Sequence, residues 1–336
     1  MNSSTSSSDA RGGLRGLALP AAVFLAVLAA GSLLLRAVYT DFPAPSVYAE
    51  ARRAIGTNTE LLVIGNSLTT MGVQPSRLSR RAVNLAVDGG HYEIIELILR
   101  RNIDRAPNAR WALIQLDNLC YLYDRMTEER DFRQLYEMGV RRQDLVKGPA
   151  AYVRQFLTDN WLLYPIFFLD RLTPANPPER PGLRREPGFQ SRTFRLTDAI
   201  LAERNLLEDE FLLESKRKPQ NRAALFRLIE RVKARGMQPV FFRMPRMPAY
   251  TRARSAEWLA REEAMIQSVR EHEGDGMILL DFRDRPGLDT THFSDTRHLN
   301  YVGAEIFTRR LDEELSSRVP GYAREPSAPP PGEAAR

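Results

Sequence analysis

A serine early in the chain and an Asp-x-x-His near its end are residue types that acyl-transfer chemistry needs. Ser67 closes the tripeptide Gly65-Asn66-Ser67 after a short apolar segment, and Asp295 and His298 precede the last predicted helix. A serine hydroxyl becomes a good nucleophile when a histidine takes its proton and a carboxylate orients that histidine. These three residues therefore indicate acyl transfer or ester hydrolysis.

Because these residues lie far apart in the sequence, a fold has to bring them together. Five short apolar segments bounded by polar turns are predicted to form buried parallel strands, at residues 60–65, 82–86, 111–117, 238–243 and 277–282. Helices are predicted at residues 47–55, 92–103, 221–235, 255–272 and 301–317. Strands that alternate with helices predict an α/β fold, with helices on both sides of a parallel sheet.

Polar residues and glycines follow several of the predicted strands where each strand ends. In open α/β sheets the ligand site lies at the carboxyl ends of the strands. The candidates that follow the first, second, third and last strands are Ser67, Gly89 with Gly90, Asn118, and Asp295 with His298. We therefore expect these residues to gather at one edge of the sheet.

These segments resemble the four sequence blocks of the SGNH/GDSL hydrolase superfamily, and in particular its membrane-anchored envelope branch. The blocks correspond to residues 65–67, 84–89, 117–118 and 295–300. The resemblance covers most of the chain that follows residue 64, except an insertion at about 119–217. It implies a three-layer α/β/α fold with a parallel, flavodoxin-like sheet.

The resemblance also implies a role for each matched residue. Ser67 would be the nucleophile, His298 the base and Asp295 the residue that orients it. The backbone N–H groups of Ser67 and Gly89 and the side chain of Asn118 would form the oxyanion hole.

The chain departs from the family pattern in two blocks. Asn66 stands where the family usually has Asp, next to the predicted nucleophile. The third block reads Leu116-Asp117-Asn118-Leu119 where the family has Gly-x-Asn-Asp. Asp117 is therefore an alternative to Asn118 as the residue that faces the site.

The other polar candidates have structural interpretations. Asn300 is predicted to cap the last helix. His91, His272 and His292 have no partner pattern in the sequence and are interpreted as structural or exposed. No spacing of His, Cys, Asp and Glu matches a metal site, so neither a metal nor another cofactor is predicted.

The segment at residues 16–35 (GLALPAAVFLAVLAAGSLLL) is uncharged and mostly apolar. A bilayer-spanning helix requires about 20 such residues. This predicts a cytoplasmic leader at 1–15, a transmembrane signal anchor at 16–36 and a single-pass protein of the inner membrane. The domain behind the anchor would be periplasmic or extracellular. The alternative is a cleaved signal peptide, since residues 29–31 are small.

The rest of the chain is predicted to form one SGNH-like domain at 37–319, followed by a disordered tail at 320–336. The insertion at about 119–217 is interpreted as a helical cap, and its aromatic patch at 161–168 as packed core or a membrane contact. The net charge is +6, but the basic residues are spread along the chain, so nucleic acid is not a predicted partner. Cys120 is the single cysteine, which excludes an intrachain disulfide.

The preferred function is a serine-dependent O-acyltransferase or acylesterase that acts on a cell-envelope glycan. The resemblance is to alginate O-acetylation proteins and the teichoic-acid D-alanyl transfer protein, and it implies a membrane-bound O-acyltransferase as partner. Two alternatives stay open. One is a lipase or esterase of small or lipid esters, and the other is a non-catalytic scaffold in a polysaccharide export complex.

Overall fold

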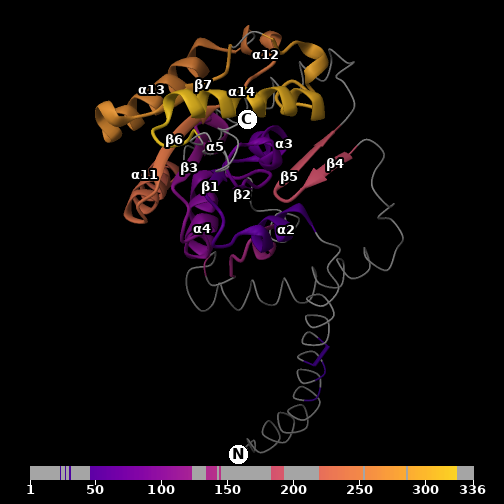
Figure 1. Cartoon of the computed structure of the whole chain (residues 1–336). Coiled ribbons are helices and arrows are strands. Elements are labelled where there is room, and N and C mark those ends of the chain that lie inside the picture. Colours follow the sequence, from indigo (N-terminus) through magenta and orange to yellow (C-terminus); the bar gives the residue numbers. More distant parts are fainter. Residues whose placement is uncertain are drawn as a thin grey trace, which may run out of the picture. The chain divides into compact units, whose positions relative to one another are not determined.

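The computed structural model describes residues 46–122, 134–141, 144, 183–192, 219–252, 254–284 and 287–323, and the isolated positions 23, 27, 30 and 31 (Figure 1). The chain divides into two compact units. Met1–Ala44 and Leu145–Pro178 form one unit, of which only those four isolated positions are described. All helices and strands named below belong to the other unit, Pro45–Asp144 and Glu179–Arg336.

A five-stranded, wholly parallel sheet forms the centre of this unit. Its strands are β1 (Leu61–Ile64), β2 (Ala82–Asn84), β3 (Trp111–Gln115), β6 (Gln238–Arg243) and β7 (Leu279–Asp281), in the order β2-β1-β3-β6-β7. All five predicted strands are confirmed. Every residue of β1 and β3 is buried, as expected for parallel strands covered on both faces. The strand order is that of flavodoxin-like sheets, in which ligands bind where the order reverses, between β1 and β3.

The five predicted helices are also confirmed, to within two residues at each end. They are α2 (Val47–Ala54), α4 (Tyr92–Asn102), α11 (Pro219–Ala234), α13 (Ala256–Glu273) and α14 (Tyr301–Arg318). Helix α4 packs against α11, and α14 packs against the short helix α3 (Ser67–Gly72). Because parallel crossovers are right-handed, this strand order places the two pairs on opposite faces of the sheet. The α/β prediction is therefore correct.

Several short elements escaped the sequence analysis. They are α3, α5 (Asn118–Leu122), α12 (Pro248–Arg252) and an antiparallel hairpin of β4 (Leu183–Glu186) and β5 (Phe189–Arg192). The hairpin lies within the segment predicted to be a helical cap, so a purely helical insertion is wrong for these residues. The dipeptide Pro187-Gly188 at its turn was the missed signal, since such pairs mark turns.

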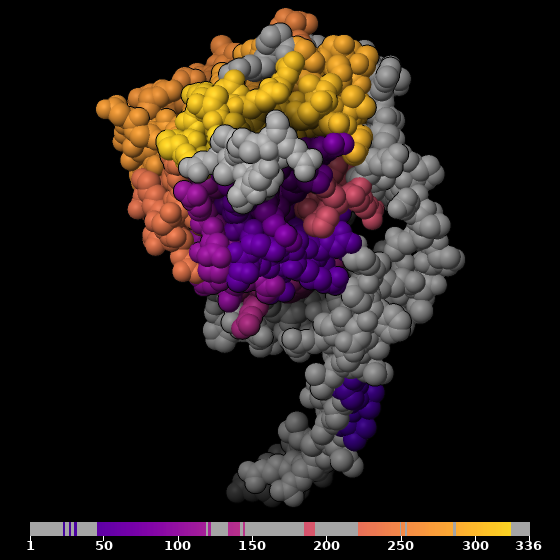
Figure 2. All heavy atoms as spheres, in the orientation of Figure 1, coloured from indigo at the N-terminus to yellow at the C-terminus, as the bar shows by residue number. Residues whose placement is uncertain are grey.

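Figure 1 shows the hairpin beside α3, and in Figure 2 its atoms (rose) reach the surface next to the early part of the same unit (indigo). Most of the remaining insertion, including the aromatic patch at 161–168, lies outside the described residues. The tail beyond residue 323 lies outside them as well.

No helix in the described part of the chain has both the length and the apolar character that crossing a bilayer requires. The predicted leader at 1–15 lies outside that part, and so does the predicted anchor at 16–36 except for positions 23, 27, 30 and 31. The anchor and the boundaries of the SGNH-like domain therefore stay predictions.

Candidate active site

The structure brings Ser67, His298 and Asp295 together in one chain of hydrogen bonds. The Ser67 Oγ lies 2.9 Å from Nε2 of His298. On the other side of the imidazole, Nδ1 lies 2.8 Å from Oδ2 and 3.0 Å from Oδ1 of Asp295. A carboxylate can only accept, so Nδ1 carries the proton of the neutral ring and Nε2 accepts from the serine hydroxyl. This is the arrangement in which a histidine can remove a serine proton.

Ser67 is placed by the sharp turn that leads from β1 into α3. Asn66 is the N-cap, and its Oδ1 accepts from the Leu68 N–H at 3.0 Å. Ser67 is the first helical residue, so its own N–H has no intrahelical partner. Gly65 is required before the cap, because a Cβ there would overlap the Thr69 hydroxyl and the Gln115 side-chain oxygen.

Gln115, at the end of β3, stabilises this turn through its side chain. Its Oε1 accepts from the Asn66 N–H at 3.0 Å and from the Thr69 hydroxyl at 2.5 Å. The side chain is fully buried, and its Nε2 has no hydrogen-bond partner. Sequence reasoning missed this residue. The available signal was a glutamine inside the otherwise apolar strand WALIQ.

The loop that carries Asp295 and His298 is folded back on itself. Phe293 and Leu299 form an antiparallel bridge, and the Ser294 N–H donates to the His298 carbonyl at 2.9 Å. Asn300 then caps α14, as predicted, by accepting from the Gly303 N–H at 3.0 Å. The loop is thus closed between Phe293 and Leu299, and Asp295 and His298 lie between these two residues.

The Asp295 carboxylate is held ionised by its surroundings. Its Oδ1 accepts from the N–H groups of Arg297 and His298, each at 2.8 Å. Burial by itself raises the pKa of Asp295, but attraction to His298 and these hydrogen bonds outweigh burial, so the pKa lies well below its usual range. Asp295 therefore stays negative and fixes the orientation of the imidazole.

The turn after β2 supplies the second predicted oxyanion donor, Gly89. Gly89 has φ +69°, a conformation that favours glycine, and a Cβ on it would meet nothing within 4 Å. The Val87 N–H donates to the Gly65 carbonyl at 3.3 Å, which ties this turn to the nucleophile turn. The roles of Ser67 and Gly89 as donors stay predictions.

The side chain of the third predicted donor, Asn118, forms a hydrogen bond with α13. Its side chain is fully buried, and Nδ2 donates to the Trp258 carbonyl of α13 at 3.0 Å. Its Oδ1 is buried without a partner. No hydrogen bond joins Asn118 to Ser67 or His298 among the described residues, so its place in the oxyanion hole also stays a prediction.

Asp117, the alternative to Asn118, is part of a buried ionic cluster. Its Oδ2 lies 2.7 Å from Nη2 of Arg246, which also lies 2.8 Å from Oε1 of Glu262. Glu262 Oε2 lies 2.7 Å from Nη2 of Arg243, and Arg243 reaches Asp281 at 3.0 Å. Burial by itself lowers the pKa of Arg246. The carboxylates of Glu262 and Asp117 together raise this pKa by more than burial lowers it, so the guanidinium stays charged. The Asp117 carboxylate is thus paired with a cation.

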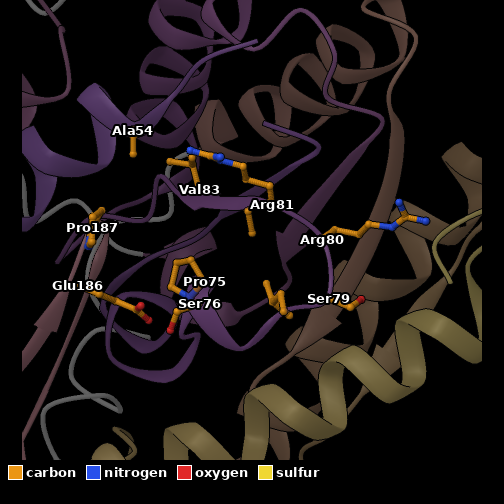
Figure 3. Close-up of a pocket in the computed structure, with 11 residues that line it drawn as sticks. Ala54, Pro75, Ser76, Ser79, Arg80, Arg81, Val83, Glu186 and Pro187 are labelled. Atoms are coloured by element: carbon orange, nitrogen blue, oxygen red, sulfur yellow. The ribbon is translucent and has the colours of Figure 1, made fainter. Parts of the chain in front are cut away.

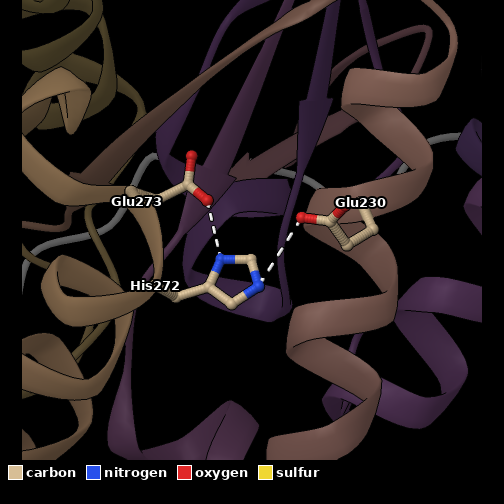
Figure 4. A group of neighbouring side chains, drawn as sticks. All are labelled: Glu230, His272 and Glu273. Carbon is tan, nitrogen blue, oxygen red and sulfur yellow. Dashed lines mark hydrogen bonds and ion pairs between the residues drawn. The ribbon is translucent and has the colours of Figure 1, made fainter.

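The other three histidines have structural partners. His91 Nδ1 lies 3.0 Å from Oδ1 of Asn221, and His292 completes a capping box with Asp289. The ring of His272 lies between the carboxylates of Glu230 and Glu273, at 3.5 and 2.8 Å (Figure 4).

Glu230, His272 and Glu273 are close enough to share a metal ion. However, Lys233 Nζ already lies 2.7 Å from Glu273 and 3.8 Å from Glu230. A lysine thus supplies the cation between the two carboxylates, and the group joins α11 to α13 as an ion-pair network.

Two surface pockets lie away from the hydrogen-bonded triad. One, of about 370 Å³, lies between the start of β2 and the hairpin turn, where Arg81 and Glu186 are among its lining residues (Figure 3). The other, of about 260 Å³, includes Arg77, Phe189 and Tyr301. Neither is lined by Ser67, Asp295 or His298. The first pocket opens at the amino end of β2, whereas Ser67 follows the carboxyl end of β1.

No protein-family model matches this chain, and no curated protein matches it. Among solved structures, one similar protein is provisionally named as an acylhydrolase from Bacteroides fragilis, with 9% identity, a TM-score of 0.39, and coverage of 80% of this chain and 94% of that protein. Another is provisionally named as a platelet activating factor from Streptococcus pneumoniae, with 10% identity, a TM-score of 0.40, and coverage of 89% and 99%. Similarity at this level carries no argument about activity.

Proposed function

We propose that this protein is a serine-dependent enzyme of acyl transfer, an SGNH-type acylesterase or O-acyltransferase. The observation that carries the proposal is the continuous hydrogen-bond chain from Ser67 through His298 to Asp295. It forms beside β1, where the strand order of the sheet reverses. The alternative of a non-catalytic scaffold would not require this alignment of the three side chains.

The first half of the reaction forms an acyl-enzyme. The Ser67 Oγ bonds to the acyl carbonyl carbon while His298 Nε2 takes the hydroxyl proton. Asp295 stabilises the imidazolium that results. When the tetrahedral intermediate collapses, the bond to the leaving alcohol breaks and His298 returns the proton to that oxygen. The acyl group then remains as an ester on Ser67.

The second half releases the acyl group to an acceptor. The acceptor, water or a sugar hydroxyl, gives its proton to His298 Nε2 and attacks the carbonyl of the acyl-enzyme. The Ser67 oxygen leaves and recovers that proton. In both halves negative charge develops on the carbonyl oxygen, where one well-placed donor is worth about 3 kcal/mol. The Ser67 and Gly89 N–H groups are proposed for that position.

The glycan acceptor is the finer part of the proposal. It is supported by the predicted signal anchor and by the resemblance to the envelope branch of the SGNH superfamily. Both favour a cell-surface polysaccharide as substrate, and the resemblance alone implies a membrane-bound O-acyltransferase as partner. Periplasmic or extracellular placement of the domain belongs to the same proposal.

The test compares wild-type protein with Ser67→Ala on p-nitrophenyl acetate. We expect Ser67→Ala to lower kcat by about 10⁴-fold or more, since loss of a triad nucleophile has effects of this order. A fluorophosphonate should label the wild type and not the variant. Ser317→Ala, on the exposed end of α14, is the control and should keep full activity.

Wild-type protein that neither turns over the ester nor takes the label would overturn the proposal. The acceptor is decided by comparing release of acetate from an acetylated polysaccharide, hydrolysis of lipid esters, and acetyl transfer onto the deacetylated polysaccharide. Preference for lipid esters would replace the glycan with the lipase alternative while Ser67 keeps its role.

A further inference from the structure

The β4–β5 hairpin contacts each of the segments that carry the proposed catalytic groups. Strand β5 runs beside α3, whose first residue is Ser67. Side chains of β5 also reach the loop of His298 and the turn of Gly89. The hairpin comes from the insertion, far in sequence from all three segments.

Ser191 is the contact to the His298 loop. Its side chain is buried, and its Oγ donates to the Leu299 carbonyl at 3.0 Å. Leu299 directly follows His298 and closes the loop through its bridge to Phe293. This hydrogen bond therefore fixes the backbone next to the imidazole from outside the loop.

Gln190 is the contact to the turn after β2. Its Nε2 donates to Oδ2 of Asp88 at 3.2 Å. Asp88 directly precedes Gly89, whose N–H is a proposed oxyanion donor. Neighbouring residues of one strand thus reach two different parts of the proposed site.

The hairpin itself packs against α2, β2 and α14. The Gly188 N–H donates to the Val47 carbonyl at 2.9 Å, and a Cβ on Gly188 would overlap the Asn84 carbonyl of β2. Phe189 is buried, and its ring centroid lies 6.3 Å from that of Tyr301, the first residue of α14. These contacts hold the hairpin on other elements of the same unit, which allows it to support the segments that it contacts.

We propose that the β4–β5 hairpin is a positioning element of the active site, in which Ser191 holds the His298 loop and Gln190 holds the Gly89 turn. The inference rests on the proposed acyl-transfer function. Neither residue takes part in bond making. Their effect is on the alignment of His298 and Gly89, and a misplacement of about 1 Å can cost roughly 100-fold in rate.

The experiment uses the full chain and the variants Ser191→Ala, Ser191→Thr and Gln190→Leu. Two controls on α13, Ser268→Ala and Gln267→Leu, remove the same types of side-chain group outside the proposed site. Ser268→Ala removes a hydroxyl that donates to the Met265 carbonyl at 2.7 Å, and Gln267→Leu removes an amide that donates to Glu271 at 3.2 Å. The measurements are kcat and KM on p-nitrophenyl acetate, and hydrogen exchange of residues 85–91 and 292–300.

We expect Ser191→Ala and Gln190→Leu each to lower kcat about 10-fold or more, with KM changed less than about twofold. Ser191→Thr keeps the hydroxyl and should recover most of the rate. Exchange should become faster at residues 292–300 in Ser191→Ala and at 85–91 in Gln190→Leu. The controls should change neither kcat nor these exchange rates.

Unchanged kcat and unchanged exchange in both hairpin variants would overturn the proposal, and so would equal losses in the controls. If the wild type has no esterase activity, the proposed function fails. Exchange then decides the hairpin question by itself, since faster exchange of the His298 loop in Ser191→Ala still supports positioning. If Ser191→Ala does not fold, Gln190→Leu supplies the loss-of-contact comparison through kcat and the exchange of residues 85–91.

Discussion

At the scale of single residues, Gln115 connects the nucleophile turn to the sheet. Replacing it with methionine removes the oxygen that accepts from Asn66 and Thr69, and leaves two donors unpaired. A buried donor without a partner costs about 1–3 kcal/mol, so we expect Gln115→Met to lower the free energy of unfolding by at least about 2 kcal/mol. It should also lower kcat, because the turn that carries Ser67 loses its support. Urea unfolding and ester turnover measure the two effects.

Gln115→Glu is the matched comparison, since it keeps an acceptor oxygen in nearly the same place. At pH 5, where burial keeps this carboxyl protonated and neutral, Gln115→Glu should lose less stability than Gln115→Met. Equal losses in the two variants would show that side-chain shape, and not the acceptor oxygen, holds the turn.

Asp295 gives a second prediction at this scale, which concerns pH. An aspartate whose folded pKa lies below its unfolded value of about 3.9 stabilises the fold above that pH, and the contribution is lost as pH falls toward the folded pKa. The difference in unfolding free energy between wild type and Asp295→Asn should therefore be large at pH 7 and 5 and smaller at pH 3. Denaturant titrations at the three values measure it. A difference independent of pH would contradict the assigned hydrogen bonds.

The sequence alone identified Ser67, His298 and Asp295, which form one chain of hydrogen bonds in the structure. Ser67 and the Asp-x-x-His have fixed local contexts, a strand exit and a loop before a helix. Asn118 and Gln115 do not, because their partners come from elements distant in sequence. Trp258 lies on α13, and Asn66 lies in the turn between β1 and α3. Tertiary contacts of this kind leave no local pattern.

At the scale of elements, the buried ionic cluster joins the ends of β3, β6 and β7 to α13. Glu262 is fully buried and pairs with both Arg243 and Arg246. Removing one partner of a buried ion pair leaves an uncompensated charge and costs about 3–5 kcal/mol. We expect Glu262→Gln to lower the free energy of unfolding by about that amount, measured by urea titration at pH 7.

Glu257→Gln is the control on the same helix. Glu257 is exposed and pairs with Arg261 on the surface, where an ion pair is worth about 0–1 kcal/mol. Similar losses in the two variants would contradict the buried cluster as a link between these elements.

The elements that the sequence predicted correctly are those with a clear period or a continuous apolar run. The segment LLVI of β1 and the amphipathic helix α4 are examples. Helix α3 is only six residues long and the hairpin strands only four, too short for a period to emerge. The hairpin is fixed instead by docking, through the close approach of Gly188 to Asn84.

At the scale of the whole molecule, the site is assembled from segments spread over residues 65 to 300. Ser67 follows the first strand and His298 precedes the last helix, so their hydrogen bond exists only while the fold holds both segments in place. The same argument applies to the hairpin, whose contacts lie on α3, on the turn after β2 and on the His298 loop. Activity and global folding should therefore be lost together.

We propose that this unit lies outside the cytoplasm, behind the predicted anchor, and cysteine labelling in cells can test that proposal. Cys120 is fully buried, and burial raises the pKa of its thiol, so it should not react with a maleimide in the folded protein. Ser317→Cys places a reactive thiol on an exposed position of α14, and Ser4→Cys places one in the predicted cytoplasmic leader.

In cells with a permeabilised outer membrane and an intact inner membrane, an impermeant maleimide should label Ser317→Cys. It should label Ser4→Cys only after the inner membrane is lysed. The unmodified chain should stay unlabelled in both conditions, because its single thiol is inaccessible. Labelling of Ser4→Cys in intact cells and not of Ser317→Cys would reverse the orientation. A glycan of the cell surface would then be out of reach of Ser67, and the lipid or small-ester alternative would take its place.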